Sequence, residues 1–174
     1  ADLAGISNEN FEGSFYDFFA DVEVDQLTHN LYLSYFSPND HSSHYYNTGT
    51  NGTSKIFVID PINYEILHSI ESKNNDRWGD IEIYPEKNKL YIAAFGNLLL
   101  FNCNTLEKLK QINTKAFRIK KCGENYLFIQ EPEVMKHTII DVNYDSYVSS
   151  TNLPSEYSGE DIYNEFITSF NSLT

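Results

Sequence analysis

The strongest constraint on the fold is a strand-like stretch, residues 80–107, whose imperfect copies lie on both sides of it. Within this stretch, Ile81 and Ile83 alternate with acidic residues, and a polar turn then leads into a second apolar run at 90–92. A third run over 98–101 ends at another polar turn and is followed by a last segment, 106–112. Alternation and polar turns at this spacing predict four short antiparallel strands.

The flanking segments repeat the spacing of the turns as well as the apolar runs. Leu31 follows Asp21 by 10 residues, as Leu90 follows Asp80 by 10 residues. The third run of each unit closes on an Asp or Asn before a turn, at Asp60, Asn102 and Asp141. Because any all-β protein supplies apolar runs by chance, agreement at the turns is the stronger sign of repetition. Three units are therefore expected.

The shared pattern combines a Leu-Tyr-Ile or Leu-Tyr-Leu strand with an apolar strand that closes on Asp or Asn before a turn reaching Glu. It resembles the blades of the YVTN/YncE-like β-propeller family over roughly residues 19–151, although the family's Gly-Pro loop between blades is absent. The resemblance implies an all-β fold of four-stranded antiparallel meanders, forming a partial propeller of about three blades. It also implies an exported, extracytoplasmic or secreted setting. A β-sandwich or one sheet of consecutive meanders is the alternative.

The repeat predicts blades at about residues 19–72, 79–114 and 115–151, preceded by an N-terminal edge segment, 1–18. Closing a propeller usually takes about 4 to 8 blades, because closure removes exposed strand edges. Three blades therefore need further blades in the same chain, a second copy of the chain, or the termini folded back over the open edges.

The repeat fails in the tail, residues 152–174. Ser158 precedes Asp161 by three residues, as at a helix start, and apolar residues follow at helical spacing. These apolar residues are Ile162, Phe166, Ile167 and Phe170. We expect a short terminal helix here, with a broken fourth blade as the alternative.

Charge and length exclude several classes of protein. The chain has 12 basic and 25 acidic residues and a net charge of −13, so a phosphate backbone would be repelled and we expect no nucleic-acid partner. No apolar run approaches the roughly 18 to 20 residues that a membrane span needs, and the chain opens without a basic and apolar leader. Two cysteines, Cys103 and Cys122, allow one disulfide at most, and we favour free thiols.

The longest irregular segment, residues 35–55, lies between the second and third strands of the first unit. Loops of this length inside compact domains are often functional. His41 and His44, with Asp40, have the donor chemistry of a zinc site. Two histidines in a loop rich in Ser, Asn and Gly are more often solvated, so we expect neither a metal nor another cofactor.

Propeller geometry places this segment and the linker 72–78 on one face, since connections between strands two and three and connections between blades emerge together. Trp78 and Arg77, with Tyr45 and Tyr46, would then form an aromatic and cationic surface of the kind enriched in binding hot spots. The alternative is that Trp78 packs between blades.

Acidic pairs repeat on the innermost strand, as Asp21 with Glu23 and Asp80 with Glu82. Paired carboxylates can perform acid-base chemistry or hold a calcium ion. Arg118 takes the corresponding place in the third unit, so a carboxylate-to-arginine network between blades explains the pattern without catalysis.

The sequence contains no nucleophile elbow, phosphate-binding loop, dinucleotide fingerprint or zinc-protease helix. We therefore expect a non-enzymatic scaffold that presents the loop face, residues 35–55 with Trp78, to a protein, peptide or glycan. The alternative is a metal- or quinone-dependent propeller enzyme, a hydrolase or oxidoreductase, with its site over the central channel.

Overall fold

The computed structural model describes residues 18–38, 52–72, 77–94, 96–131 and 136–152. These residues form three separate four-stranded antiparallel sheets. The first sheet contains β1 (Phe18–Val24), β2 (Leu31–Pro38), β3 (Gly52–Asp60) and β4 (Glu65–Glu71). The second contains β5 (Trp78–Tyr84), β6 (Lys89–Ala94), β7 (Asn97–Asn102) and β8 (Lys108–Ile112), with a 3-10 turn, η1 (Pro85–Lys87), after β5. The third contains β9 (Arg118–Cys122), β10 (Tyr126–Gln130), β11 (Lys136–Asp141) and β12 (Ser146–Asn152).

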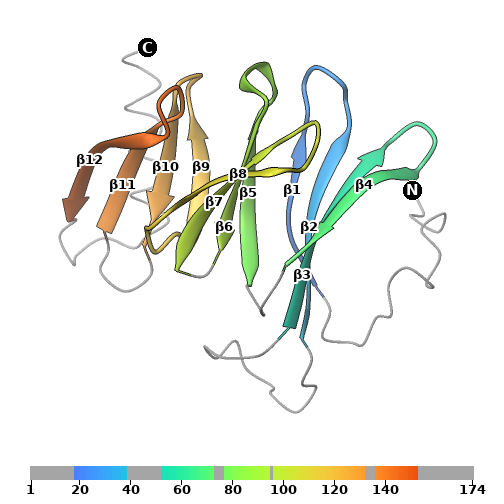
Figure 1. The fold of residues 1–174 in the computed structure, drawn as a ribbon, viewed down its shortest axis with the longest axis horizontal. Coiled ribbons are helices and arrows are strands. Elements are labelled where there is room, and N and C mark those ends of the chain that lie inside the picture. The colour runs from blue at the N-terminus through green and yellow to red at the C-terminus, as the bar shows by residue number, and fades with distance from the viewer. Residues whose placement is uncertain (1–17, 39–51, 73–76, 95, 132–135, 153–174) are drawn as a thin grey trace.

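Each sheet is a meander in which every strand pairs with the next strand along the chain. Figure 1 shows the three sheets side by side in chain order, and their first strands β1, β5 and β9 are neighbours in space. The fold is therefore all-β, with three blades arranged as a partial β-propeller. The expected fold class is confirmed, and neither a two-layer sandwich nor one continuous sheet describes the chain.

The register confirms the internal alignment of the first two units. Val24 pairs with Leu31 in the first sheet, and Ile83 pairs with Leu90 in the second. Both members of the second pair lie 59 positions after their counterparts in the first. The inner hairpins of the two blades are thus superimposable in register.

The turn after each third strand is built in the same way in all three sheets. The Asp or Asn that closes the strand accepts a hydrogen bond at Oδ1 from the backbone N–H two residues later. These bonds join Asp60 to Ile62 at 2.7 Å, Asn102 to Asn104 at 2.9 Å and Asp141 to Asn143 at 2.8 Å. The residue four positions after the Asp or Asn has positive φ, namely 57° at Tyr64, 56° at Leu106 and 50° at Asp145. The short polar side chain thus replaces a backbone turn partner, which explains why the repeat requires Asp or Asn there.

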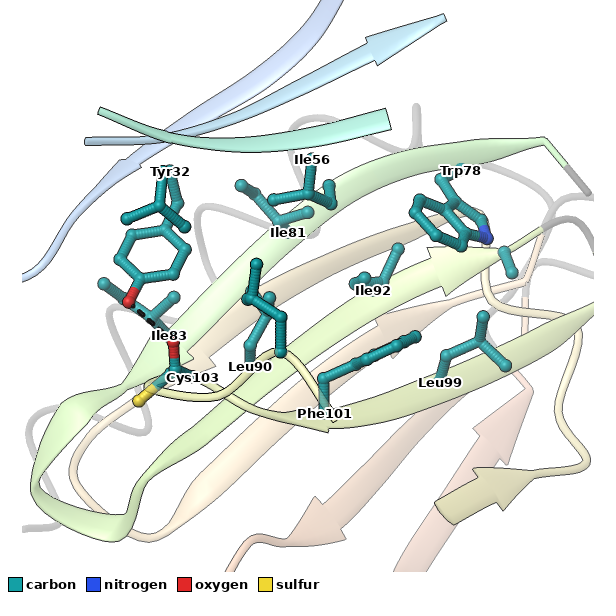
Figure 2. Close-up of a cluster of buried hydrophobic side chains, with 13 residues drawn as sticks. Tyr32, Ile56, Trp78, Ile81, Ile83, Leu90, Ile92, Leu99, Phe101 and Cys103 are labelled. Carbon is teal, nitrogen blue, oxygen red and sulfur yellow. Dashed lines mark hydrogen bonds between the residues drawn. The ribbon is translucent and has the colours of Figure 1, made fainter. Parts of the chain in front are cut away.

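Two apolar layers hold the three sheets together. The layer between the first and second sheets joins Tyr32 and Ile56 to residues such as Trp78, Leu90 and Phe101 (Figure 2). The layer between the second and third sheets contains Tyr91, Leu98, Leu127, Ile129 and Ile140, among others. Each apolar side chain that is fully buried here contributes about 1.5–3 kcal/mol, so these two layers supply most of the stability of the stack.

A tyrosine on the second strand of a sheet ties that sheet to the next one. The Tyr32 hydroxyl donates to the backbone carbonyl of Cys103, 2.9 Å away, as the dashed line in Figure 2 shows. At the equivalent position, the Tyr91 hydroxyl donates to the carboxylate of Asp145. Both acceptors lie in the turn after the third strand of the following sheet. The third sheet has Phe128 at this position and cannot make the bond.

One expectation about the loops is wrong. The segment 35–55 was expected to be irregular throughout, but β2 and β3 stay paired as far as Pro38 and Gly52. Cross-strand packing of Tyr35 and Phe57, whose ring centroids are 6.2 Å apart, supports this extension. The expected N-terminal segment before Phe18 and the expected C-terminal helix lie outside the described residues.

We predict that Tyr91→Phe lowers the free energy of unfolding by about 1–2 kcal/mol, because it removes a hydrogen bond to a charged acceptor between sheets. Urea unfolding measures the change. Tyr144→Phe is the matched control, since that side chain is 77% exposed and should have no effect. Equal stability of the two variants would contradict the role given to the Tyr91 hydroxyl.

Candidate functional site

Charged side chains from three sheets meet along the inner strands. In each sheet, a charged residue on the first strand pairs with the aromatic residue on the second strand. These pairs are Glu23 with Tyr32, Glu82 with Tyr91, and Lys120 with Phe128. We call Glu23, Glu82 and Lys120 the inner charge cluster.

Lys120 bridges the two carboxylates of the inner charge cluster. Its Nζ lies 2.9 Å from Oε1 of Glu82 and 3.4 Å from Oε1 of Glu23. The Glu82 side chain is only 2% exposed, whereas the Lys120 side chain is 47% exposed. The ammonium group that pairs with the buried Glu82 carboxylate therefore belongs to a side chain that is about half exposed to water. Solvent screening weakens the electrostatic attraction between the two groups.

Burial shifts the titration of these acids upward. Burial raises the pKa of Glu82 to about 7, and the negative charge of Glu23 adds to this, while Lys120 opposes it. The pKa of Asp80 is raised to about 6, mainly by burial and next by the charge of Asp21. Burial also raises the pKa of Glu23. Carboxyl groups whose pKa values lie near neutral pH, as those of Asp80 and Glu82 do, can hold or release a proton, which makes them candidates for a functional role.

The two aspartates of the inner strands connect neighbouring sheets. Asp21 Oδ2 accepts a hydrogen bond from the backbone N–H of Ile81 at 3.0 Å. Asp80 Oδ2 accepts the equivalent bond from Ile119 at 3.4 Å. The repeated aspartate is thus a structural link from each blade to the next one.

The carboxylate-to-arginine network expected between blades is replaced by a carboxylate-to-lysine one. Arg118 stands at the position of Asp21 and Asp80 and acts on Asp80 by lowering its pKa, against the larger effect of burial. The ion pairs to carboxylates are made by Lys120 instead. The role of Lys120 could have been predicted from the sequence, because Lys120 follows Arg118 by two residues, just as Glu23 follows Asp21. Lys120 therefore occupies the position in the third unit that Glu23 occupies in the first.

Residues at the ends of three strands form the described rim of the loop face. The Oγ of Ser54, near the start of β3, accepts a hydrogen bond from the backbone N–H of Trp78 at 2.8 Å. The backbone N–H of Ser72 donates to the Ser54 carbonyl at 2.7 Å. Beside them, the Arg77 guanidinium lies 5.2 Å from the centroid of the Phe36 ring. The start of β3, the end of β4 and the start of β5 therefore lie together, as expected from propeller geometry.

Trp78 does not offer its ring to a partner. Its side chain is 4% exposed, and its ring packs edge-on against Phe101 with centroids 6.0 Å apart (Figure 2). Of the two alternatives drawn from the sequence, packing between blades describes this residue. The register shift between Trp78 and Ile81 places both side chains in the same apolar layer.

The remaining expected site residues divide between described and undescribed parts of the chain. Arg77 lies on the rim and is half-buried. Tyr45, Tyr46 and the weak metal candidates Asp40, His41 and His44 lie outside the described residues. Among the described residues, no three His, Cys, Asp or Glu side chains gather as a metal site would require.

The two cysteines are free and buried, as favoured from the sequence. Burial raises the pKa of both the Cys103 and the Cys122 thiols, which keeps them protonated and unreactive. Within the described ranges, no helix is long and apolar enough for a membrane span.

No protein-family model matches the sequence. No curated protein matches it either. Among solved structures, Kluyveromyces lactis Hsv2 with a complete loop 6CD is 12% identical, with 79% of this chain and 37% of that chain covered and a TM-score of 0.47. A form of Hsv2 with loop 6CD replaced by a Gly-Ser linker is 11% identical, with 82% and 42% covered and a TM-score of 0.49. Dihydro-heme d1 dehydrogenase NirN is 13% identical, with 79% and 38% covered and a TM-score of 0.48. The chain spans less than half the length of each of these structures.

We predict that the inner charge cluster makes stability fall as pH rises. The folded-state pKa of Glu82, about 7, lies above its ordinary value of 4.5. Stability from the bound proton is therefore full below about pH 4.5 and is lost as pH rises through 7. Relative to Glu82→Gln, which cannot ionise, the wild-type protein should lose on the order of 2 to 3 kcal/mol across this window.

Urea unfolding at pH 4.5 and at about pH 8 measures this difference. Glu124→Gln, at an exposed turn position, is the control and should follow the wild type at both pH values. A constant difference between wild type and Glu82→Gln across the window would contradict the upward shift.

Proposed function

We propose that the chain is a non-enzymatic β-propeller scaffold that binds a protein or peptide through its loop face. The observation that supports the non-enzymatic part of this proposal is that the inner-strand carboxylates already bind groups of neighbouring sheets. Asp21 and Asp80 accept backbone hydrogen bonds from the next sheet, and Glu23 and Glu82 share Lys120. Side chains that could perform chemistry in the channel thus link the blades to each other.

The proposed surface is the rim around Arg77 together with the loop that contains Tyr45 and Tyr46. Arg77 extends from a strand start that is held by Ser54 and by the buried ring of Trp78. Binding residues are often carried by loops that a rigid scaffold positions. Arginine and tyrosine supply cationic and aromatic contacts that dominate many protein interfaces. Trp78 therefore contributes by supporting this rim from below.

Two finer assignments belong to the same proposal. The Leu-Tyr-Ile and Leu-Tyr-Leu strands and the Asp or Asn turns support membership of the YVTN/YncE-like family. That membership would imply an exported, extracytoplasmic protein. A glycan is the alternative ligand of the same face.

Site-specific photo-crosslinking tests the loop face. A crosslinking amino acid at Arg77 should capture a defined protein or peptide, and unlabelled wild-type protein should compete for it. An unlabelled competitor in which a Gly-Ser linker replaces residues 40–50 should no longer compete, and its circular dichroism spectrum should show the same β-sheet signal as the wild type.

The matched control is the same crosslinker at Leu109, on the outer strand β8, where the side chain is 52% exposed. The crosslinker at Leu109 should capture no protein or peptide whose crosslinking is prevented by unlabelled wild-type protein. Equal capture from both positions would overturn the assignment of binding to the loop face, and competition by a free glycan alone would favour the glycan instead.

The second candidate is a metal-dependent propeller enzyme, favoured by the raised pKa values of Asp80 and Glu82 on neighbouring inner strands. Thermal unfolding with added calcium or zinc separates it from the scaffold. The scaffold predicts no rise in Tm beyond that given by magnesium at equal ionic strength.

A rise in Tm that Glu82→Gln abolishes would support the enzyme, because it would place the cation in the channel. A rise that His41→Ala with His44→Ala abolishes would place a metal in the loop instead. Either result would contradict a metal-free scaffold.

A further inference from the structure

The face of the third sheet that points away from the second sheet is buried only along its middle. One cross-strand row on this face runs from Lys120 through Phe128 and Ile139 to Ser149. Phe128 is 1% exposed, Ile139 is half-buried, and the two residues at the ends of the row are exposed. His137, two positions before Ile139 on β11, is 5% exposed. The buried strip therefore covers β10 and β11 but neither of the outer two strands of the sheet.

A whole sheet covers the corresponding face of the second blade more widely. There the same row begins at Glu82 and Tyr91, which are 2% and 0% exposed in the seam with the third sheet. The counterpart of Glu82 in the third sheet is Lys120, whose side chain is 47% exposed. Neighbouring strands lie about 4.8 Å apart, so two buried strands match the diameter of one helix, about 10 Å. The extent of burial thus fits a single helix and not a further blade.

The chemistry of this face defines what covers it. His137 stacks on Phe128 with ring centroids 4.8 Å apart, and neither of its ring nitrogens has a hydrogen-bond partner. Buried polar groups are nearly always paired where a partner is within reach, so the cover presents apolar side chains over this ring. Beside the buried strip, Arg118 and Lys120 are exposed cations on β9. A segment that is apolar on one face and acidic elsewhere complements both features.

The tail that follows β12 has this composition. It begins directly after Asn152, at the end of the last strand of the same sheet. Residues 153–174 include acidic side chains and no basic ones. Ile162, Phe166 and Phe170 recur at every fourth position, which places them on one face of a helix.

We propose that residues 158–170 form a helix that lies along β10 and β11 and covers Phe128 and His137. Phe166 and Phe170 face the sheet, and the acidic residues of the tail lie near the cations of β9. The helix takes the place of a following blade on this face, as terminal repeats with a polar outer surface do in repeat proteins. This cap goes beyond the proposed binding function, because it uses a face of the third sheet and not the loop face.

Chemical modification of histidine tests the cap. Diethyl pyrocarbonate acylates accessible imidazole nitrogens, and mass spectrometry of the digested protein gives the rate at each histidine. In the wild-type chain, His137 should react far more slowly than His68, which is exposed on β4. Phe166→Glu places a charge against the apolar strip and should release the helix, so that His137 reacts as fast as His68.

Thr168→Glu is the matched control, because position 168 lies on the opposite face of the expected helix and should leave His137 protected. Circular dichroism and the rate at His68 should be the same in both variants, and Phe166→Ala replaces Phe166→Glu if the sheets of the latter unfold. Equal rates at His137 in the wild type and the Phe166 variant, or equal release by the Phe166 and Thr168 variants, would overturn the proposal. Protection that weakens on dilution would overturn it as well, because the cover would then come from a second copy of the chain.

Discussion

Face-to-face packing between consecutive sheets is the interaction on which the rest of this structure depends. Ile81, Leu90 and Ile92 are fully buried in the first seam, and each contributes about 1.5–3 kcal/mol. The ion pair between Glu82 and the half-exposed Lys120 mainly offsets the cost of burying that carboxylate, so its net contribution to stability is small. The inner charge cluster is therefore held in place by the apolar seams and contributes little to forming them. Its raised pKa values are a consequence of that packing, because the seams exclude water from Glu82.

Directional contacts add specificity to these seams. A second-strand tyrosine donates to the turn of the next sheet, and an inner-strand aspartate accepts from its backbone. Apolar packing alone tolerates sliding, whereas these bonds are satisfied in one register only. In both kinds of hydrogen bond, the tyrosine or aspartate side chain belongs to one sheet and its partner to the next sheet along the chain. The stack of sheets therefore has a direction. The third sheet has Phe128 and Arg118 at the two positions, and the direction of the repeat ends there.

Particular residues show how far sequence reasoning reaches. The positions of the Asp and Asn turns were predicted from the sequence because these turns depend on local geometry, in which the Asp or Asn side chain accepts a hydrogen bond two residues later. The sequence left open whether Trp78 is buried or exposed, since a register shift puts it and Ile81 in the same layer against strict alternation. The length of β2 and β3 was underestimated, because Ser, Asn and Gly suggest a loop while the pairing energy comes from the opposite strand. Lys120 was missed because its role depends on the length of its side chain and on two sheets that are distant in sequence.

The amino-acid sequence by itself determined the three units, their four strands each and the turns that join the third strand to the fourth. These features depend on neighbours within a few residues, and local patterns encode them directly. Only the tertiary structure decided which faces of the sheets meet, which charges share Lys120, and which apolar residues remain exposed on the first sheet. Those outcomes depend on residues far apart in the sequence, such as Glu23 and Lys120, which are 97 positions apart and come together only when the sheets stack.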